Sequence, residues 1–124
     1  MPERKKVLFC DDPGDLRFLQ GMMAETGMGV EFVPLCGDRY HPSPEELERI
    51  ESETVGGDYD HVVIGNNMGA GVQRATAVAE GMRDSTSIVW NVYAPGAEQP
   101  YRGLGIRHFL SRDDLPGHLR NVLK

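Results

Sequence analysis

The sequence predicts an α/β fold, in which one parallel sheet of five short strands carries helices on both faces. Two observations predict it. Short apolar runs of the buried-strand type recur along the chain, and each is followed by a segment with apolar residues at helical spacing. Strands that alternate with helices in this way form parallel sheets through right-handed crossovers. The length of 124 residues suits a single domain, residues 1–124, with one hydrophobic core.

The alternation defines five strand–helix units. The expected strands span residues 5–10, 30–36, 60–65, 87–94 and 106–110. The expected helices span residues 11–27, 43–53, 71–83, 95–105 and 112–124. The fourth helical segment contains several prolines and glycines, so we expect it to be short or irregular.

The first two helices begin with clear sequence signals. Asp12 is the expected N-cap of the first helix, with Pro13 at its first position. Ser43, followed three residues later by Glu46, predicts a capping box at the start of the second helix. Pro34 indicates that the second strand lies at an edge of the sheet, because proline has no backbone N–H to donate.

A chain of this size favours the flavodoxin-like, three-layer sandwich with strand order 2-1-3-4-5. Sites in such sheets form at the carboxyl ends of the strands, around the switch between strands 1 and 3. That rule places Asp11 and Asp12, which follow the first strand, next to Gly65 and Asn66. The sequence therefore predicts a candidate site at this edge of the sheet.

Composition argues against several classes of function. The formal net charge of −6 repels nucleic acids and anionic membranes. No apolar run approaches the roughly 20 residues of a membrane span, and the first residues do not form a signal peptide. We therefore expect a cytoplasmic protein.

Cys10 and Cys36 lie at the ends of the first two expected strands. They are either a redox pair or small buried apolar residues.

Three segments resemble the receiver domains of two-component response regulators, the CheY-like family. KVLFCDDPGDLRFLQGMM, residues 6–23, resembles their first strand, acidic pair and first helix. YDHVVIGNNMGAG, residues 59–71, resembles their third strand and phosphorylation loop. YRGLGIRHFLSR, residues 101–112, resembles the fifth strand and the lysine that follows it. The resemblance covers essentially the whole chain and implies the CheY-like fold.

In that family, an acidic pair and a phospho-accepting aspartate hold Mg²⁺, and the aspartate takes a phosphoryl group from a phosphohistidine. The resemblance assigns the acidic pair to Asp11 and Asp12. The acceptor position falls on Gly65, or on Asn66 if the strand contains a one-residue bulge. Neither side chain can form an acyl phosphate. The resemblance thus implies a degenerate receiver, or pseudo-receiver, that is not phosphorylated.

Other positions of the family pattern are also altered. The lysine position is Arg112, and the proline that would follow it is Asp113. The position of a Ser/Thr hydroxyl lies within residues 90–92, where Asn91 is the nearest polar candidate. Phe109 takes the position of the aromatic switch residue on the fifth strand.

The acidic pair Asp11 and Asp12 has two interpretations. In one, the pair keeps a weak Mg²⁺ site, with two side-chain carboxylates and no third. In the other, Asp12 caps the first helix and Asp11 is solvated at the end of the strand. Without a cation the two carboxylates repel each other, so one pKa should rise. A further hypothesis is that Arg112 supplies the missing charge through a salt bridge.

The glycine-rich segment Gly65–Gly71 also has two interpretations. Backbone N–H groups at the start of a helix can cradle an anion, although the P-loop and dinucleotide-binding patterns are absent. Alternatively, the segment is a flexible connection whose glycines permit positive φ.

These observations favour a stand-alone, receiver-like signalling module that acts by protein–protein contact, is not an enzyme and needs no cofactor. The expected partner surface consists of Tyr101, His108, Phe109, Arg112 and Asp113. The alternative is a small flavodoxin-like ligand- or phosphate-binding protein, or an enzyme, that uses Gly65–Gly71. A third possibility is a structural or assembly subunit.

Overall fold

The computed structural model of the chain describes most of its length. The described residues are 5–25, 29–35, 37–38, 40–56, 59–66, 68–81, 87–90, 92, 95–111 and 113–122. No helix within these ranges combines the length and the apolar character that a membrane crossing requires.

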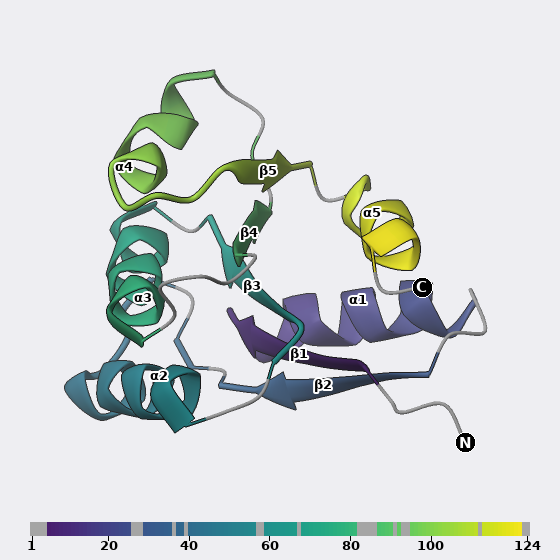
Figure 1. Cartoon of the computed structure of the whole chain (residues 1–124), viewed down its shortest axis with the longest axis horizontal. Coiled ribbons are helices and arrows are strands. Elements are labelled where there is room, and N and C mark those ends of the chain that lie inside the picture. Colours follow the sequence, from purple (N-terminus) through teal and green to yellow (C-terminus); the bar gives the residue numbers. More distant parts are fainter. Residues whose placement is uncertain are drawn as a thin grey trace.

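Strands and helices alternate along the whole chain (Figure 1). Their order is β1 (Lys5–Cys10), α1 (Pro13–Ala24), β2 (Val30–Pro34), α2 (Pro44–Gly56), β3 (His61–Gly65), α3 (Met68–Gly81), β4 (Ser87–Trp90), the 3₁₀-helix η1 (Pro95–Glu98), α4 (Gln99–Arg102), β5 (His108–Leu110) and α5 (Leu115–Val122).

The five strands form one sheet in the order β2-β1-β3-β4-β5, with every neighbouring pair parallel. This is the order that the sequence predicts, and Pro34 lies on an edge strand as expected. The central strands β3 and β4 are buried along their whole length. All carboxyl ends of the strands lie at one edge of the sheet, because the strands are parallel.

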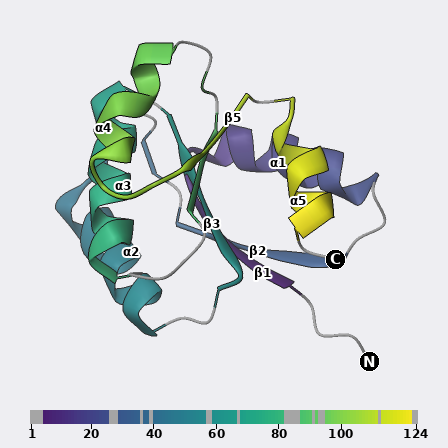
Figure 2. The same cartoon turned by 45° about the horizontal axis from the view of Figure 1, so that its top comes forward.

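Helices cover both faces of the sheet. α1 and α5 lie on one face, and α2, α3 and α4 lie on the other (Figures 1 and 2). Under α1 and α5, the core contains Phe9, Leu19 and Trp90 among its larger side chains. Under α2 to α4, the core contains Ile64 and Tyr101. The alternating side chains of each buried strand supply both clusters, as in other doubly covered parallel sheets.

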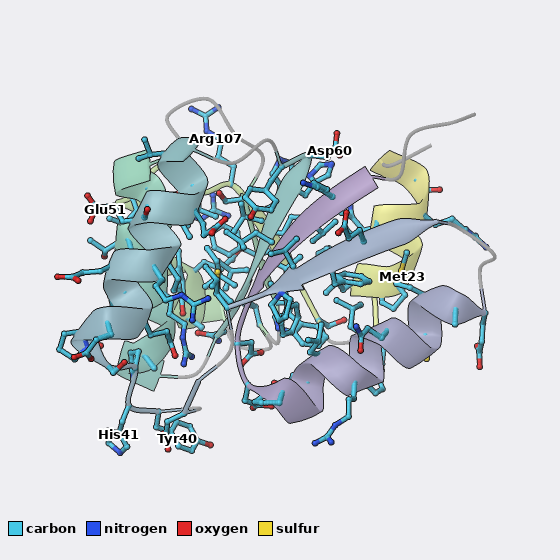
Figure 3. All side chains as sticks on the ribbon, turned by 90° about the horizontal axis from the view of Figure 1, so that it is seen from below. Met23, Tyr40, His41, Glu51, Asp60 and Arg107 are labelled. Carbon is cyan, nitrogen blue, oxygen red and sulfur yellow. The ribbon has the colours of Figure 1, made fainter. Side chains whose placement is uncertain are left out.

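The loops at the amino ends of the strands and those at the carboxyl ends lie at opposite ends of the molecule. Figure 3 places Asp60 and Arg107, which precede β3 and β5, at one end of the molecule. Tyr40 and His41, in the connection from β2 to α2, lie at the opposite end (Figure 3). That second end is the carboxyl edge, where the sequence predicts the site.

Several element boundaries differ from the sequence prediction. α3 begins at Met68 and not at residue 71, so Gly69 and Gly71 lie in its first turn despite the low helix propensity of glycine. β5 begins at His108 and not at residue 106, so it is shorter than its apolar run. The described part of β4 spans Ser87–Trp90, and residues 91, 93 and 94 of its predicted run lie outside the described residues. The irregular fourth segment is confirmed: it forms η1 and a single turn, α4.

Candidate functional site

The site is built around the acidic pair at the end of β1. Asp12 is the N-cap of α1, since its Oδ1 accepts a hydrogen bond of 2.8 Å from the backbone N–H of Asp15. This confirms the predicted cap. Asp11 has no exposed surface, so the interpretation of a solvated Asp11 is wrong. Its Oδ1 accepts a hydrogen bond of 2.7 Å from the backbone N–H of Asp12.

A third carboxylate, Asp15, joins this pair, which corrects the expectation of only two. Asp15 is 2% exposed, and one carboxylate oxygen from each of Asp11, Asp12 and Asp15 lies within 4.8 Å of the others. The sequence reasoning missed Asp15. The signal was present, because a residue three positions after an N-cap lies in the first turn, directly beside the capping side chain.

Gly65, the acceptor position that the resemblance predicts, faces Asp11. The pairing of β3 runs without a break to Ile64 on the β1 side and to Gly65 on the β4 side, so β3 contains no one-residue bulge that would bring Asn66 to this place. A Cβ atom built on Gly65 would lie 2.2 Å from Cγ of Asp11. The carboxyl group of Asp11 therefore fills the space that a side chain at position 65 would need.

Trp90 holds Asp11 in this place. It pairs with Gly65 across the sheet, and its indole Nε1–H donates a hydrogen bond of 2.9 Å to Oδ2 of Asp11. The ring is fully buried and packs edge-to-face on Phe9 and at a tilt on Phe18. Trp90 thus supplies Asp11 with a hydrogen-bond donor that the sequence analysis did not predict.

The electrostatics of the cluster follow from its burial. Burial, a hydrogen bond with the Asp15 carboxyl group and the charge of Asp15 raise the pKa of Asp11 from 3.8 to about 7. The donors Trp90 and Asp12 N–H oppose this rise. The pKa of Asp11 is raised as predicted, but the causes are burial and Asp15, and the backbone N–H of Asp12 lowers this pKa.

These residues do not fit a strong Mg²⁺ site. Mg²⁺ requires near-octahedral oxygen ligands and keeps several waters, whereas Asp11 is fully buried and accepts N–H hydrogen bonds on both oxygens. Asp12 uses one oxygen to cap α1. The arrangement is suited to hydrogen bonds and a shared proton.

Some predicted site residues lie outside the described residues. These are Asn91, Arg112 and Cys36. The salt bridge from Arg112 and the pairing of Cys10 with Cys36 therefore remain predictions. Cys10 itself is buried in the core under α2 to α4.

Asn66 and Tyr101 connect the end of β3 to α4. The hydroxyl group of Tyr101 donates a hydrogen bond of 2.8 Å to Oδ1 of Asn66. Tyr101 is 1% exposed, so its expected place on a partner surface is wrong: its ring packs in the core. Burial, together with the charge of Asp11, raises the pKa of Tyr101 to about 12.

The segment Gly65–Gly71 is not the open loop that the sequence suggests. α3 begins at Met68, and within the described chain only Gly105 has a positive φ, of 89°. A Cβ atom on Gly71 would lie 2.2 Å from the hydroxyl oxygen of Tyr101. Gly71 therefore permits the close packing of Tyr101.

An open hollow of about 470 Å³ lies beside the start of α3. It is lined by Asn66, Gly69, Val72, Gly96, Ala97, Pro100 and Tyr101. None of these side chains is cationic, so the lining offers no charged partner for a phosphate group.

The remaining residues of the expected partner surface have different exposures. His108 and Asp113 are exposed. Phe109 is half-buried, and the guanidinium group of Arg102 lies 4.8 Å from the centre of its ring. Arg112 lies outside the described residues.

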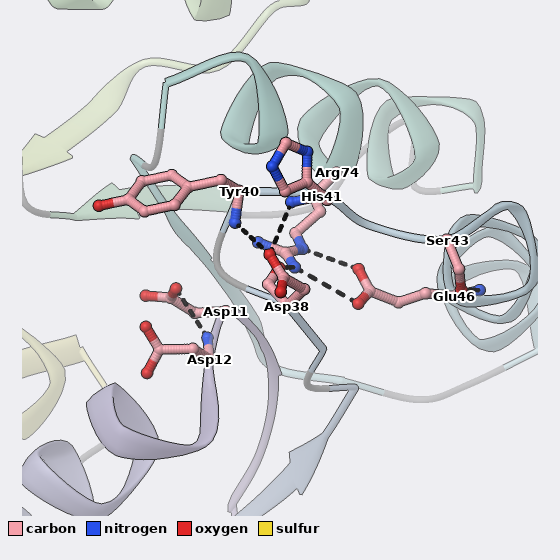
Figure 4. A network of polar contacts seen from close by, with 8 residues as sticks. All are labelled: Asp11, Asp12, Asp38, Tyr40, His41, Ser43, Glu46 and Arg74. Atoms are coloured by element: carbon pink, nitrogen blue, oxygen red, sulfur yellow. Dashed lines mark hydrogen bonds and ion pairs between the residues drawn. The ribbon is translucent and has the colours of Figure 1, made fainter.

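A second buried charged group, absent from the sequence prediction, is Arg74 on α3. Arg74 has no exposed surface, and its Nε lies 2.8 Å from Oε2 of Glu46 on α2 (Figure 4). Its Nη2 also donates to the backbone carbonyl of Asp38. Only half of the predicted capping box forms: Ser43 accepts from the backbone N–H of Glu46 at 3.1 Å, while the Glu46 side chain contacts Arg74.

No protein-family model and no curated protein sequence matches the chain. Solved structures are similar to it over nearly its whole length. A CheY-like response regulator receiver domain from Methanospirillum hungatei has 12% identity and a TM-score of 0.66, covering 98% of this chain and 94% of that one. The chain has the receiver fold. A response regulator from Thermotoga maritima has 10% identity and a TM-score of 0.66, with 98% of each chain covered.

Another similar structure is that of the histidine kinase ThkA in complex with the response regulator protein TrrA. It has 18% identity and a TM-score of 0.60, covering 97% of this chain and 99% of that chain. At such identities, similarity establishes the fold, and the function has to be argued from the site.

Proposed function

We propose that this protein is a receiver-like signalling module that acts by protein–protein contact, without phosphoryl transfer or other enzymatic activity. The observation that carries the proposal is the carboxyl group of Asp11 beside Gly65. It fills the place of the acceptor side chain. We also propose that the module is cytoplasmic.

The three carboxylates of the cluster are poorly placed to serve as the phospho-acceptor in place of residue 65. A phospho-acceptor has to reach the phosphohistidine of another protein, whereas Asp11 and Asp15 are 0% and 2% exposed. Asp12 is 7% exposed, and it holds the N-terminus of α1. This supports a module whose signalling does not begin with an acyl phosphate.

Mass spectrometry tests the absence of phosphorylation. The native protein would be incubated with Mg²⁺ and acetyl phosphate, and the intact mass measured under conditions that preserve acyl phosphates. We expect no added phosphoryl group. A phosphorylated aspartate at any position of the cluster would contradict this part of the proposal.

A protein partner is the second part of the proposal. It is supported by the receiver fold and by the similar structure in which the response regulator protein TrrA is bound to a histidine kinase. His108 and Asp113 offer exposed polar contacts at β5 and before α5. We propose this surface, together with Phe109 and Arg112, as the contact.

Capture experiments with matched variants test the surface. Immobilised native protein would be compared with His108→Glu/Asp113→Arg and with the control Glu48→Lys/Glu51→Lys, whose residues are exposed on α2. Figure 3 shows Glu51 pointing away from the sheet. We expect the native chain and the control to capture the same protein, and His108→Glu/Asp113→Arg to fail to capture it. Equal capture by all three would place the contact elsewhere.

A second candidate function is binding of a small molecule, which the hollow beside α3 favours. Because its lining has no cationic side chain, a neutral ligand fits it better than a phosphate. NMR titration with phosphate, nucleotides and uncharged heterocycles tests this. Shifts at Gly69 and Val72 would support a binding protein, and unchanged spectra with all of these compounds would remove this candidate.

A further inference from the structure

Two histidines face each other on the side of the molecule opposite α2 and α3. His108 lies on β5 and His118 lies on α5. The centres of their rings are 5.9 Å apart, and the ring planes are inclined by 44°. His108 is exposed and His118 is half-buried, so the pair is open to solvent on one side.

One nitrogen of this pair has no hydrogen-bond partner among the described residues. Nε2 of His118 is buried, and no described residue donates to it or accepts from it. Buried polar atoms in native proteins are nearly always satisfied, and an exception points to a water or an ion that completes the contact. The unpartnered nitrogen is therefore an observation independent of the distance between the rings.

The charge state of His118 suits a metal ion. A histidine binds a metal through its neutral form, and its ordinary pKa is about 6.5. Burial and the neighbouring His108 lower the pKa of His118 from that value. Near pH 7.5, the ring of His118 is therefore available as a ligand without the loss of a proton.

We propose that His108 and His118 form a two-histidine site for a divalent transition-metal ion of the Zn²⁺ class, which would connect α5 to β5. Imidazole ligands favour Zn²⁺, Ni²⁺ and Cu²⁺ over Mg²⁺. Two imidazoles bound at about 2.1 Å to one tetrahedral ion have ring centres about 5 Å apart. The ring centres are 5.9 Å apart in the structure, so binding of the ion requires the two rings to move closer together. Water, or a ligand from another protein, completes the coordination.

This site is separate from the carboxylate cluster at the end of β1 and does not depend on the proposed function. The cluster offers only oxygen ligands from Asp11, Asp12 and Asp15. An ion that prefers nitrogen ligands therefore distinguishes the two places.

Thermal unfolding with and without Zn²⁺ tests the proposal. The melting temperature of the native protein would be measured at pH 7.5 and compared with His108→Gln, His118→Gln and the control His41→Gln. His41 is an exposed histidine between β2 and α2. At a Zn²⁺ concentration ten times its dissociation constant, we expect an increase of about 4–6 °C for the native protein and the control.

Both pair variants should lose this increase. Because His108 is exposed, His108→Gln should fold normally, and it keeps the test valid if His118→Gln is unstable. NMR provides a second measurement: Zn²⁺ should shift the ring signals of His108 and His118 and leave those of His41 unchanged. An equal Zn²⁺ response in the native protein and His108→Gln, or no response at all, would overturn the proposal.

Discussion

Two buried charged groups of this molecule are neutralised in opposite ways. On α3, the Arg74 guanidinium is paired with Glu46, and the side chains are 0% and 10% exposed. At the end of β1, Asp11 and Asp15 carry the same sign of charge. The connection from β2 to α2 contacts the Arg74 guanidinium and the main chain of Asp11, since the carbonyl of Asp38 accepts from Arg74 and the N–H of Gly37 donates to the backbone carbonyl of Asp11.

The difference shows how a core can contain ionisable groups. The pair formed by Arg74 and Glu46 depends on both charges, because removing one leaves the other buried without its partner. The carboxylate cluster depends on a proton and on the N–H donor of Trp90. The pair of Arg74 and Glu46 stabilises the fold when both side chains are ionised. The carboxylate cluster stabilises the fold when Asp11 is protonated.

The largest expected effect is the loss of the buried ion pair. Arg74→Ala should lower the free energy of unfolding by about 3–5 kcal/mol, because the Glu46 carboxylate then lacks its partner. Urea unfolding measures this change. The control is Arg102→Ala, which removes the exposed pair of Arg102 with Glu98 and should cost less than about 1 kcal/mol. Similar costs for the two variants would show that the pair of Arg74 is not the stronger one.

The next effect concerns the space that Asp11 occupies. Gly65→Ala should destabilise the fold by about 1–3 kcal/mol, because the new methyl group overlaps the Asp11 carboxyl group. The double variant Asp11→Ala/Gly65→Ala should cost less than the sum of the two single changes. Gly69→Ala is the control, since nothing lies within 4 Å of its Cβ position and alanine favours a helix. Additive costs in the double variant would show that Asp11 does not fill this space.

The pH dependence of stability should distinguish the cluster from the ion pair. The folded state raises the pKa of Asp11 to about 7 from 3.8, so it favours the protonated form. This contribution is complete below about pH 4 and is lost as the pH rises through about 7. Between pH 5 and 7.5, the native protein should lose about 2–3 kcal/mol of stability through this group, and Asp11→Asn should not show this loss.

The range from pH 5 to 7.5 excludes the effect of Asp38, whose lowered pKa changes stability only at pH values below its ordinary pKa of 3.8. The lowered pKa of His118 gives a change of the opposite sign, but it is common to both proteins and cancels in their difference. Parallel stability profiles for native protein and Asp11→Asn would contradict a raised pKa of Asp11.

The smallest expected effect is the loss of one hydrogen bond. Tyr101→Phe removes the donor to Asn66 and should reduce the free energy of unfolding by about 1 kcal/mol. Tyr40→Phe serves as the control, because Tyr40 is half exposed and a surface change of this kind stays within about 0.5 kcal/mol. If the two variants unfold alike, the hydroxyl group of Tyr101 contributes nothing measurable to the position of α4.

Local signals made much of the fold predictable. The N-cap Asp12, the helical start at Pro13 and the edge position of Pro34 each depend on backbone chemistry within a few residues. The strand order followed from the alternation of strands and helices, which restricts the topology strongly. The position of Gly65 opposite the acidic pair followed from that order.

The interior of the site was less predictable. Trp90 and Asp11 are 79 positions apart, and no periodic pattern connects an indole donor with a distant carboxyl group. Arg74 lies in a helix of small residues, where its partner Glu46 had a simpler assignment as a capping residue. Such contacts depend on packing in three dimensions, so they become visible only with the structure.

The indole beside Asp11 also provides a natural optical probe. Trp90 is the only tryptophan of the chain, and it is fully buried with its N–H on the carboxyl group that titrates near neutrality. Its fluorescence therefore arises from one place in the molecule. Ionisation of the adjacent acid, entry of an ion or displacement of the first strand can each be followed by emission from the unlabelled protein.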